Sequence, residues 1–350
     1  DDFAAVARLR PEGEALFALH VHRAGLDMAR GRWADSGADL RQAVALRPDS
    51  PVAYQDLGLL ALEQARYDDA VRWLDEALRR APPQARAKVE AQRGKALEGA
   101  GRHADAIRAC DEALALHPDW ADTHLVRGQA LLEGGRYAEA VQALTRSLDG
   151  GGAAVREIAR YAYRGRGLAY LRLGNYPAAL GDFTQALAVE PGADLYDRRG
   201  WTYFFADAWK PALADFEEAL RREPGHEEAR VGRGLCRALL GQYRGAAADA
   251  EEAWQHRTKN AETVYNLSCV FAQVAGRARA DRASPDGPAL AAHCRARAVE
   301  ALRTALSLKP PGQRLPFWRN PVLTDTALDP IRGSAEFERL AAQVEAGQLP

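Results

Sequence analysis

The sequence is poor in the residues on which disulfide-stabilised and metal-binding proteins depend. Only four of its 350 residues are cysteines, and no two of them form a CxxC pair: Cys110, Cys236, Cys269 and Cys294. This spacing supports neither a zinc site nor a disulfide framework, so we expect four free thiols in a reducing, cytoplasmic compartment. The only methionine is Met28, and none opens the sequence. We therefore expect a fragment or a processed form of a longer protein.

The sequence also lacks an excess of charge and any long apolar run. It has 47 basic and 48 acidic residues, a net charge of −1. A nucleic-acid-binding protein usually has a basic excess, because its lysines and arginines displace the counterions of the phosphates. No run of about 18 apolar residues is present, and no signal peptide is visible. We expect neither a nucleic-acid nor a membrane partner.

Motifs for catalysis are missing as well. The sequence contains no GxxxxGK[ST] phosphate loop, no HExxH or GxSxG motif, and no HRD or DFG motif of a kinase. His20 and His22 would point about 200° apart on a helix and could not share a metal ion. His293 adjoins Cys294, but no third group is in place to orient such a pair. We predict no catalytic residue, no cofactor and no metal site.

What the sequence does have is an internal repeat. The segments 53–83, 161–191 and 195–224 each carry an early small residue, an aromatic residue at a turn, two later alanines and a closing proline. The early small residues are spaced by 34, 36, 34, 39, 33, 34 and 35 residues: Ala24, Gly58, Gly94, Gly128, Gly167, Gly200, Gly234 and Cys269. The turn position is occupied in step with them by Trp33, Tyr67, His103, Tyr137, Tyr176, Trp209 and Tyr243.

This pattern predicts pairs of helices of about 12–15 residues joined by a short turn. Small residues let the two backbones of a pair approach closely. An apolar residue after the turn, such as Leu144 or Phe216, would fill the space between one pair and the next. Prolines would end the second helix because they cannot donate to its hydrogen bonds: Pro48, Pro82, Pro118, Pro191 and Pro224. No single pair buries enough surface to be stable alone, so stacking must supply a continuous core.

These residues resemble the tetratricopeptide repeat (TPR), and the resemblance covers about residues 17–275. It implies an all-α, right-handed TPR solenoid, or superhelix, of about eight helix-turn-helix repeats with a C-terminal capping segment. We expect a lead-in at residues 1–16, repeats 1–4 at 17–148, a glycine-rich joint at 149–159, repeats 5–8 at 160–310 and a cap at 311–350. An insert at 276–288 would split the last repeat as a loop, and Phe337 and Leu340 would cover its exposed end.

The C-terminal part carries a second, narrower resemblance. Residues 264–275, 296–308 and 324–343 are similar to the tail of TPR regions in large planctomycete-type bacterial proteins. Those regions commonly follow a serine/threonine kinase domain and sometimes a protease-like domain. The resemblance implies an accessory module of a signalling protein.

One group of side chains is a candidate binding site. Trp201, Phe204 and Phe205 are spaced i, i+3, i+4 and therefore lie on one side of a helix. In the TPR pattern this side faces the concave surface, where an aromatic patch rimmed by arginines would concentrate affinity for a partner. The remaining predicted groove residues are Tyr161, Arg164, Leu168, Leu171, Arg172, Arg198, Leu235 and Leu239. The alternative is that the three rings pack between adjacent first helices and belong to the core. Some TPR domains bind a C-terminal carboxylate with lysine and asparagine at fixed positions of the first helices. We do not expect this binding mode here, because the matching positions hold residues such as Val21, Gly25, Gln55, Leu59, Ala91 and Lys95.

The sequence therefore predicts a non-catalytic scaffold that binds a protein or peptide segment along its concave face. Two alternatives stay open. The chain could be the non-catalytic part of an enzyme whose catalytic domain lies outside these residues. For that enzyme, a kinase is favoured over a protease. It could also be a stand-alone regulator that sequesters an effector until it is displaced or cleaved, with 149–154 and 276–288 as natural cut sites.

Overall fold

The computed structural model describes residues 13–151, 155–256 and 258–348, and within these ranges the regular structure is helical throughout, without a strand. Eight successive helix pairs account for most of it, which confirms the all-α repeat fold. The pairs are α2 (Glu14–Ala29) and α3 (Trp33–Leu46), α4 (Pro51–Glu63) and α5 (Tyr67–Arg80), α6 (Pro83–Gly99) and α7 (His103–Leu116), α8 (Ala121–Glu133) and α9 (Tyr137–Asp149), α10 (Arg156–Arg172) and α11 (Tyr176–Val189), α12 (Ala193–Phe205) and α13 (Trp209–Arg222), α14 (Glu227–Leu239) and α15 (Tyr243–Gln255), and α16 (Ala261–Ala280) and α17 (Gly287–Leu308).

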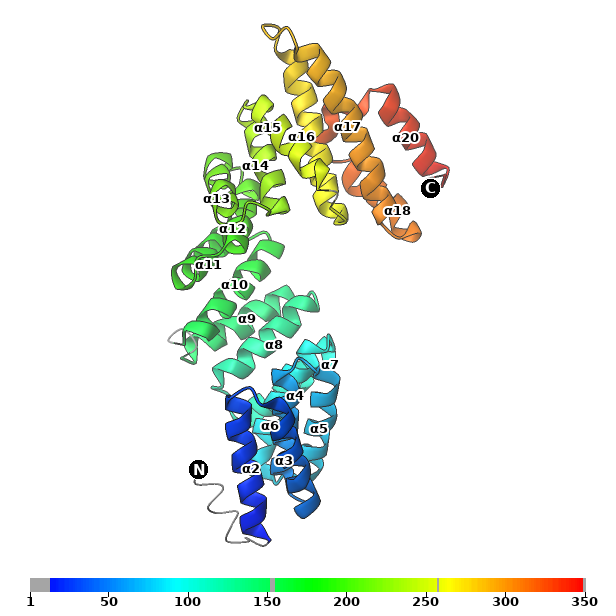
Figure 1. Ribbon diagram of the computed structural model, residues 1–350. Coiled ribbons are helices and arrows are strands. Elements are labelled where there is room, and N and C mark those ends of the chain that lie inside the picture. The colour runs from blue at the N-terminus through cyan, green and yellow to red at the C-terminus, as the bar shows by residue number, and fades with distance from the viewer. Residues whose placement is uncertain (1–12, 152–154, 257, 349–350) are drawn as a thin grey trace. The chain divides into compact units, whose positions relative to one another are not determined.

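The chain forms two compact units, residues 1–175 and 176–350, here called the N-terminal and C-terminal units. The N-terminal unit contains α2 to α10 and the C-terminal unit α11 to α20 (Figure 1). The division falls in the turn between α10 and α11, and not at the glycine-rich segment. The last residues of the predicted joint, 149–159, are helical, because α10 begins at Arg156. Residues 152–154 of the predicted joint lie outside the described residues.

The ends of the helices coincide with the prolines and turn residues of the sequence. Each of the five second helices that precede a repeat-closing proline ends two residues before it, as predicted. The turn inside a pair needs one residue with a left-handed backbone, two positions before the turn aromatic. Glycine occupies this position in most repeats, since it adopts a positive φ without steric cost. The residues are Gly31, Ala65, Gly101, Gly135, Gly174, Asp207 and Gly241, with φ between 53° and 81°.

Close packing between helices depends on glycines that face large side chains. Phe216 of α13 is fully buried, and its ring lies against Gly200 of α12 and Gly232 of α14. A Cβ atom at Gly232 would lie 2.4 Å from Cζ of Phe216. In the N-terminal unit Leu144 is buried in the same way against Gly128 and Gly165. These residues therefore fill the space between successive pairs, as the sequence predicts.

We expect Gly232→Ala to lower the free energy of unfolding of the C-terminal unit by about 1–3 kcal/mol, because the new methyl group overlaps the Phe216 ring. Thermal unfolding followed by circular dichroism measures the effect. Gly181→Ala is the matched control: Gly181 is also helical, but a Cβ there meets nothing within 4 Å. It should stabilise α11 by about 0.5–1 kcal/mol through helix propensity alone. Equal melting temperatures for the two variants would contradict this account of the packing.

The predicted loop at 276–288 is shorter than expected. α16 continues to Ala280 and α17 begins at Gly287, so only residues 281–286 join them without helix. Packing explains the difference, because Gly276 lies against Pro330 and Ala278 is fully buried. The loop itself is held to α15 by Tyr243, whose hydroxyl donates to Asp281 at 2.7 Å.

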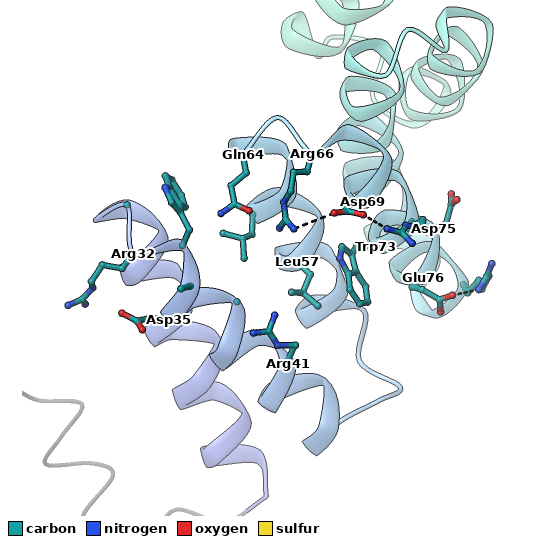
Figure 2. A pocket seen from close by; sticks show the side chains of 17 residues that line it. Arg32, Asp35, Arg41, Leu57, Gln64, Arg66, Asp69, Trp73, Asp75 and Glu76 are labelled. Carbon is teal, nitrogen blue, oxygen red and sulfur yellow. Dashed lines mark hydrogen bonds and ion pairs between the residues drawn. The ribbon is translucent and has the colours of Figure 1, made fainter.

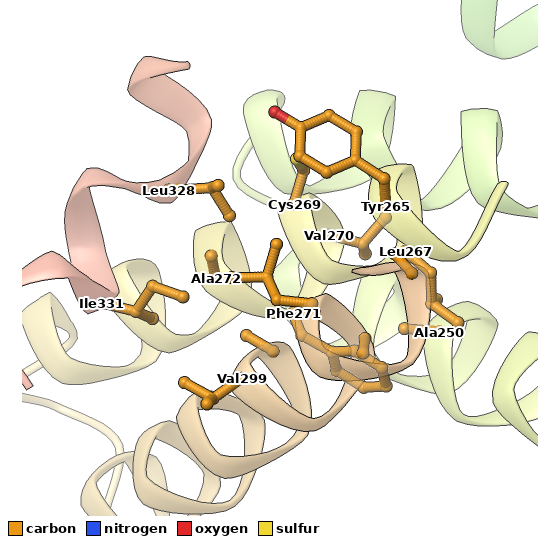
Figure 3. Packing of buried hydrophobic residues seen from close by; sticks show 14 of the residues in the cluster. Ala250, Tyr265, Leu267, Cys269, Val270, Phe271, Ala272, Val299, Leu328 and Ile331 are labelled. Carbon is orange, nitrogen blue, oxygen red and sulfur yellow. The ribbon is translucent and has the colours of Figure 1, made fainter. Parts of the chain in front are cut away.

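The C-terminal segment covers the last helix pair. It consists of α18 (Pro311–Phe317), η2 (Trp318–Val322), η3 (Thr326–Leu328), α19 (Asp329–Arg332) and α20 (Ala335–Glu345). Trp318, Leu328 and Ile331 are fully buried in one cluster with side chains of α16 and α17. Figure 3 shows Leu328 and Ile331 beside residues of these two helices. The Tyr265 hydroxyl also donates to Asp325 at 2.6 Å. Phe337 and Leu340 are buried in the same cluster, as predicted, so the segment protects apolar surface that a further repeat would otherwise cover.

Candidate functional site

Four aromatic rings gather at the C-terminal end of α12, and we call them the aromatic patch: Tyr176, Trp201, Phe204 and Phe205. The Trp201 ring centroid lies 5.5 Å from that of Phe204 and 6.0 Å from that of Phe205. Phe205 stacks on Tyr176 of α11 at 6.4 Å. The i, i+3, i+4 spacing therefore does bring the three predicted rings together. Tyr176 was expected only as a packing residue of the turn, and the structure adds it to the patch.

The rings of the patch differ in exposure, and this difference bears on both interpretations of the sequence. Trp201 is half-buried and meets the buried Phe216 edge to face, with ring centroids 5.3 Å apart. Phe204 is also half-buried and packs against the same buried cluster. Phe205, in contrast, keeps 50% of its surface exposed. Trp201 and Phe204 thus contribute to the core, while Phe205 offers free apolar surface beside them.

The electrostatic surroundings of the patch are more acidic than the sequence suggested. Asp197 lies one helical turn before Trp201 and is 5% exposed; its carboxyl has a pKa of about 8, raised chiefly by burial and also by the nearby Glu228 and Asp194, while Arg198 acts in the opposite direction. Arg198 was predicted to orient acidic groups of a partner. It pairs with Asp194 at 3.3 Å, the i, i−4 neighbour on the same helix, and its role toward a partner stays a prediction.

The two predicted leucines of α14 are less accessible than expected. Leu235 is only 5% exposed and belongs to a buried cluster, so it supplies packing and not a contact surface. Leu239 is half-buried. Trp201 and Phe204 pack against the cluster that contains Leu235, so Leu235 supports the patch from below its surface.

The other five predicted residues lie on α10, in the N-terminal unit. Tyr161, Arg164, Leu168 and Leu171 are half-buried, and Arg172 is exposed. The guanidinium group of Arg160 stacks over the Tyr161 ring at 4.3 Å from its centroid. These residues belong to a different unit from the aromatic patch, and their role in binding stays a prediction.

Sequence reasoning missed a recurrent pair of buried charges. Arg23 pairs with Asp39, Arg199 with Asp215 and Arg233 with Asp249, in each case 16 residues apart. The three aspartates are nearly buried. The fixed spacing could have revealed these pairs: the arginine immediately precedes the early small residue, and the aspartate comes six residues after the turn aromatic.

No group of three histidine, cysteine or carboxylate side chains that could hold a metal ion occurs in the described ranges. All four cysteines are free and buried. Burial raises the pKa of Cys110, Cys236 and Cys294 to about 12, which keeps these thiols protonated and unreactive. His293 is an exposed residue that contacts Glu251 at 2.7 Å. Among the described helices, none has the length and apolar character that crossing a membrane requires.

Comparison with known proteins supports the repeat assignment. Models described as tetratricopeptide repeat match residues 27–92, 92–155, 160–193 and 198–262, which together exceed half of the chain. No curated protein sequence matches the chain.

Several solved structures share the fold. A tetratricopeptide repeat protein from Parabacteroides merdae ATCC 43184 is 19% identical, with a TM-score of 0.52, over 73% of this chain and 99% of that one. PilW, a widely conserved type IV pilus biogenesis factor, is 18% identical over 61% and 96% of the two chains, with a TM-score of 0.53. PilF of Pseudomonas aeruginosa is 17% identical over 61% and 95%, with a TM-score of 0.52. At these identities the similarity establishes the fold alone.

Proposed function

Because the chain belongs to the tetratricopeptide-repeat family, we propose that it is a non-catalytic scaffold that binds a segment of another protein through the aromatic patch of α12. Members of this family generally act as scaffolds for protein–protein interactions. The sequence and the described residues offer no competing catalytic arrangement on which an enzymatic proposal could rest.

The observation that carries the proposal is the half-exposed Phe205. Its ring is held between Tyr176 and Trp201, and Trp201 is in turn fixed against the buried Phe216. A rigid, partly exposed aromatic group of this kind loses little side-chain entropy when a partner covers it. Aromatic residues are enriched among the few side chains that dominate binding energies at interfaces. The ligand that fits this surface is a segment bearing apolar side chains.

The proposal extends to the setting of the protein. The similarity of residues 264–343 to TPR tails of planctomycete-type proteins favours an accessory module of a bacterial signalling polypeptide. A serine/threonine kinase domain, or less readily a protease domain, would then lie on the same polypeptide. The native reading frame upstream of Asp1 tests this part of the proposal directly.

We expect Phe205→Ala to weaken partner binding by about 2 kcal/mol or more while leaving the melting temperature nearly unchanged. The reason is that half of the ring is exposed, so its removal leaves little cavity behind. Affinity purification with mass spectrometry identifies proteins retained by the unmodified chain, and titration calorimetry then measures the affinity of each variant for them.

Two further variants complete the test. Leu116→Ala removes a side chain that is 57% exposed in the N-terminal unit, and it should leave binding intact. Trp201→Ala should reduce stability as well as binding, because Trp201 packs on Phe216. Full retention of every partner by Phe205→Ala would mean that the patch is not the binding site.

A further inference from the structure

A large groove is formed entirely by residues of the N-terminal unit, whereas the aromatic patch belongs to the C-terminal unit. It has a volume of about 1170 Å³ and is lined by residues of α3, α4 and α5 and of the turns beside them. Its apolar part consists of Leu57, Leu60 and Trp73, which pack in one cluster, together with the exposed Trp33. Figure 2 shows Leu57 between Arg41 and Trp73 in the middle of this groove.

The sequence departs from its own repeat at two positions that line the groove. Gly37 occupies the position that holds Val71, Ile107, Val141, Leu180, Leu213 or Ala247 in the other repeats. Leu57 occupies the position that holds Arg23, Arg93, Arg127, Arg166, Arg199 or Arg233. The first change lets Leu60 of α4 and Arg41 approach α3, each to 3.4 Å from where a Cβ of residue 37 would be. The second replaces a charged side chain by an apolar one.

Two more departures meet in the same groove. Trp73 replaces the aspartate or alanine found six residues after the other turn aromatics. An apolar contact involving Leu57 and Trp73 therefore stands between α4 and α5 where other repeats have an arginine–aspartate pair. Arg41 occupies the position that holds Asp75, Asp111, Thr145, Thr184, Glu217 or Glu251 elsewhere. All four exceptional residues line the groove.

The charge of the groove indicates which kind of ligand it would bind. Five arginines and four carboxylates line it, a balance of +1. Arg66 and Arg72 share Asp69, Arg79 pairs with Glu76, and Arg32 pairs with Asp27. Arg41 is the lining arginine to which no carboxylate within the described ranges comes close enough for an ion pair. Its guanidinium group lies over Gly37, and its Nη1 atom is 3.4 Å from where a Cβ of residue 37 would be.

We propose that this groove is a second protein-binding site, which takes a segment carrying a large apolar side chain next to an aspartate or glutamate. The apolar side chain packs against the half-buried Trp73 and the small parts of Leu57 and Leu60 that reach the groove. The neighbouring carboxylate accepts hydrogen bonds from Arg41. The site is independent of the aromatic patch, since it is built entirely from residues of the N-terminal unit.

The test uses a displayed library of random 12-residue peptides, selected on the unmodified chain. Recovered peptides are then synthesised with a fluorophore, and their affinities are measured by fluorescence anisotropy. We expect a shared pattern of one large apolar residue beside an acidic one. Gly37→Val restores an apolar side chain like those of the other repeats, displaces Arg41 and Leu60 from their contacts with this position, and should weaken these peptides at least tenfold. Arg41→Glu should also weaken them at least tenfold, and more at low ionic strength than at high.

Matched controls isolate the groove from general effects. Gly181→Val makes the same change at a helical glycine with open space around it, and Arg30→Glu makes the same charge reversal outside the lining. Both should bind the peptides within twofold of the unmodified chain, as should Phe205→Ala. Since Arg41 is exposed, its replacement keeps the test decisive even if Gly37→Val folds poorly. A selection that yields only basic peptides, or none sensitive to Gly37→Val and Arg41→Glu, overturns the proposal.

Discussion

Asp249→Ala is expected to lower the free energy of unfolding of the C-terminal unit by about 3–5 kcal/mol. The Asp249 side chain is 4% exposed and accepts hydrogen bonds from two arginines. Arg233 donates to it through Nε and Nη2 at 3.1 and 2.5 Å, and Arg237 through Nη1 at 3.0 Å. Without the carboxylate, Arg233, whose side chain is only 20% exposed, loses its ion-pair partner, and Arg237, at 23%, keeps only Glu217 at 3.2 Å. Leaving a charge buried and unpaired costs far more than the pair contributes.

The chain supplies a control for this effect in the pair formed by Arg244 and Asp286. Here too the aspartate binds both ends of one guanidinium group, at 2.8 and 2.5 Å, but the two side chains are 55% and 60% exposed. Water screens this pair and can replace it, so Asp286→Ala should lower the free energy of unfolding far less than Asp249→Ala does. Chemical denaturation of both variants compares the two pairs directly. If the two substitutions cost the same, burial is not what makes Asp249 important.

The repeat architecture could be predicted from the sequence because it depends on properties that each residue carries by itself. Proline ends a helix wherever it stands, and a glycine opposite Phe216 permits close approach whatever surrounds the pair. The eight helix pairs, the buried Phe216 and the covering role of Phe337 and Leu340 follow from such local rules. The length of the loop after α16 does not, because contacts with Pro330 and Asp281 decide it.

The candidate sites were less predictable, since they depend on which side chains meet in space. Periodicity places Trp201, Phe204 and Phe205 on one side of α12, but it cannot show that Phe216 supports Trp201 or that Tyr176 stacks on Phe205. It also could not show that Leu235 is buried. The groove of the N-terminal unit could not be predicted for another reason. It depends on positions where one repeat differs from the others, and the residues that the repeats share carry no information about those positions.

The second large effect concerns pH and the buried Asp197. Its carboxyl has a pKa of about 8 in the folded chain, chiefly because burial disfavours the charged form, against about 4 in an unfolded chain. Between these values the folded state holds a proton that the unfolded state has released. Stability must therefore fall as pH rises through this window, by about 1.4 kcal/mol per unit for this group, or on the order of 4 kcal/mol from pH 5 to pH 8.

Asp197→Asn isolates this contribution, because the amide has the shape of the carboxylic acid and does not titrate. The variant and the unmodified chain should unfold at similar denaturant concentrations near pH 5. At pH 8 the variant should be the more stable of the two, by an amount that grows steadily across the interval. Comparing the two chains at each pH cancels the other titrating groups, including Glu90 and Asp56, whose pKa values burial raises in the same direction. Parallel pH profiles for the two chains would show that the Asp197 carboxyl ionises normally in the folded state. The burial around Trp201 would then admit enough water to solvate a charge beside the aromatic patch.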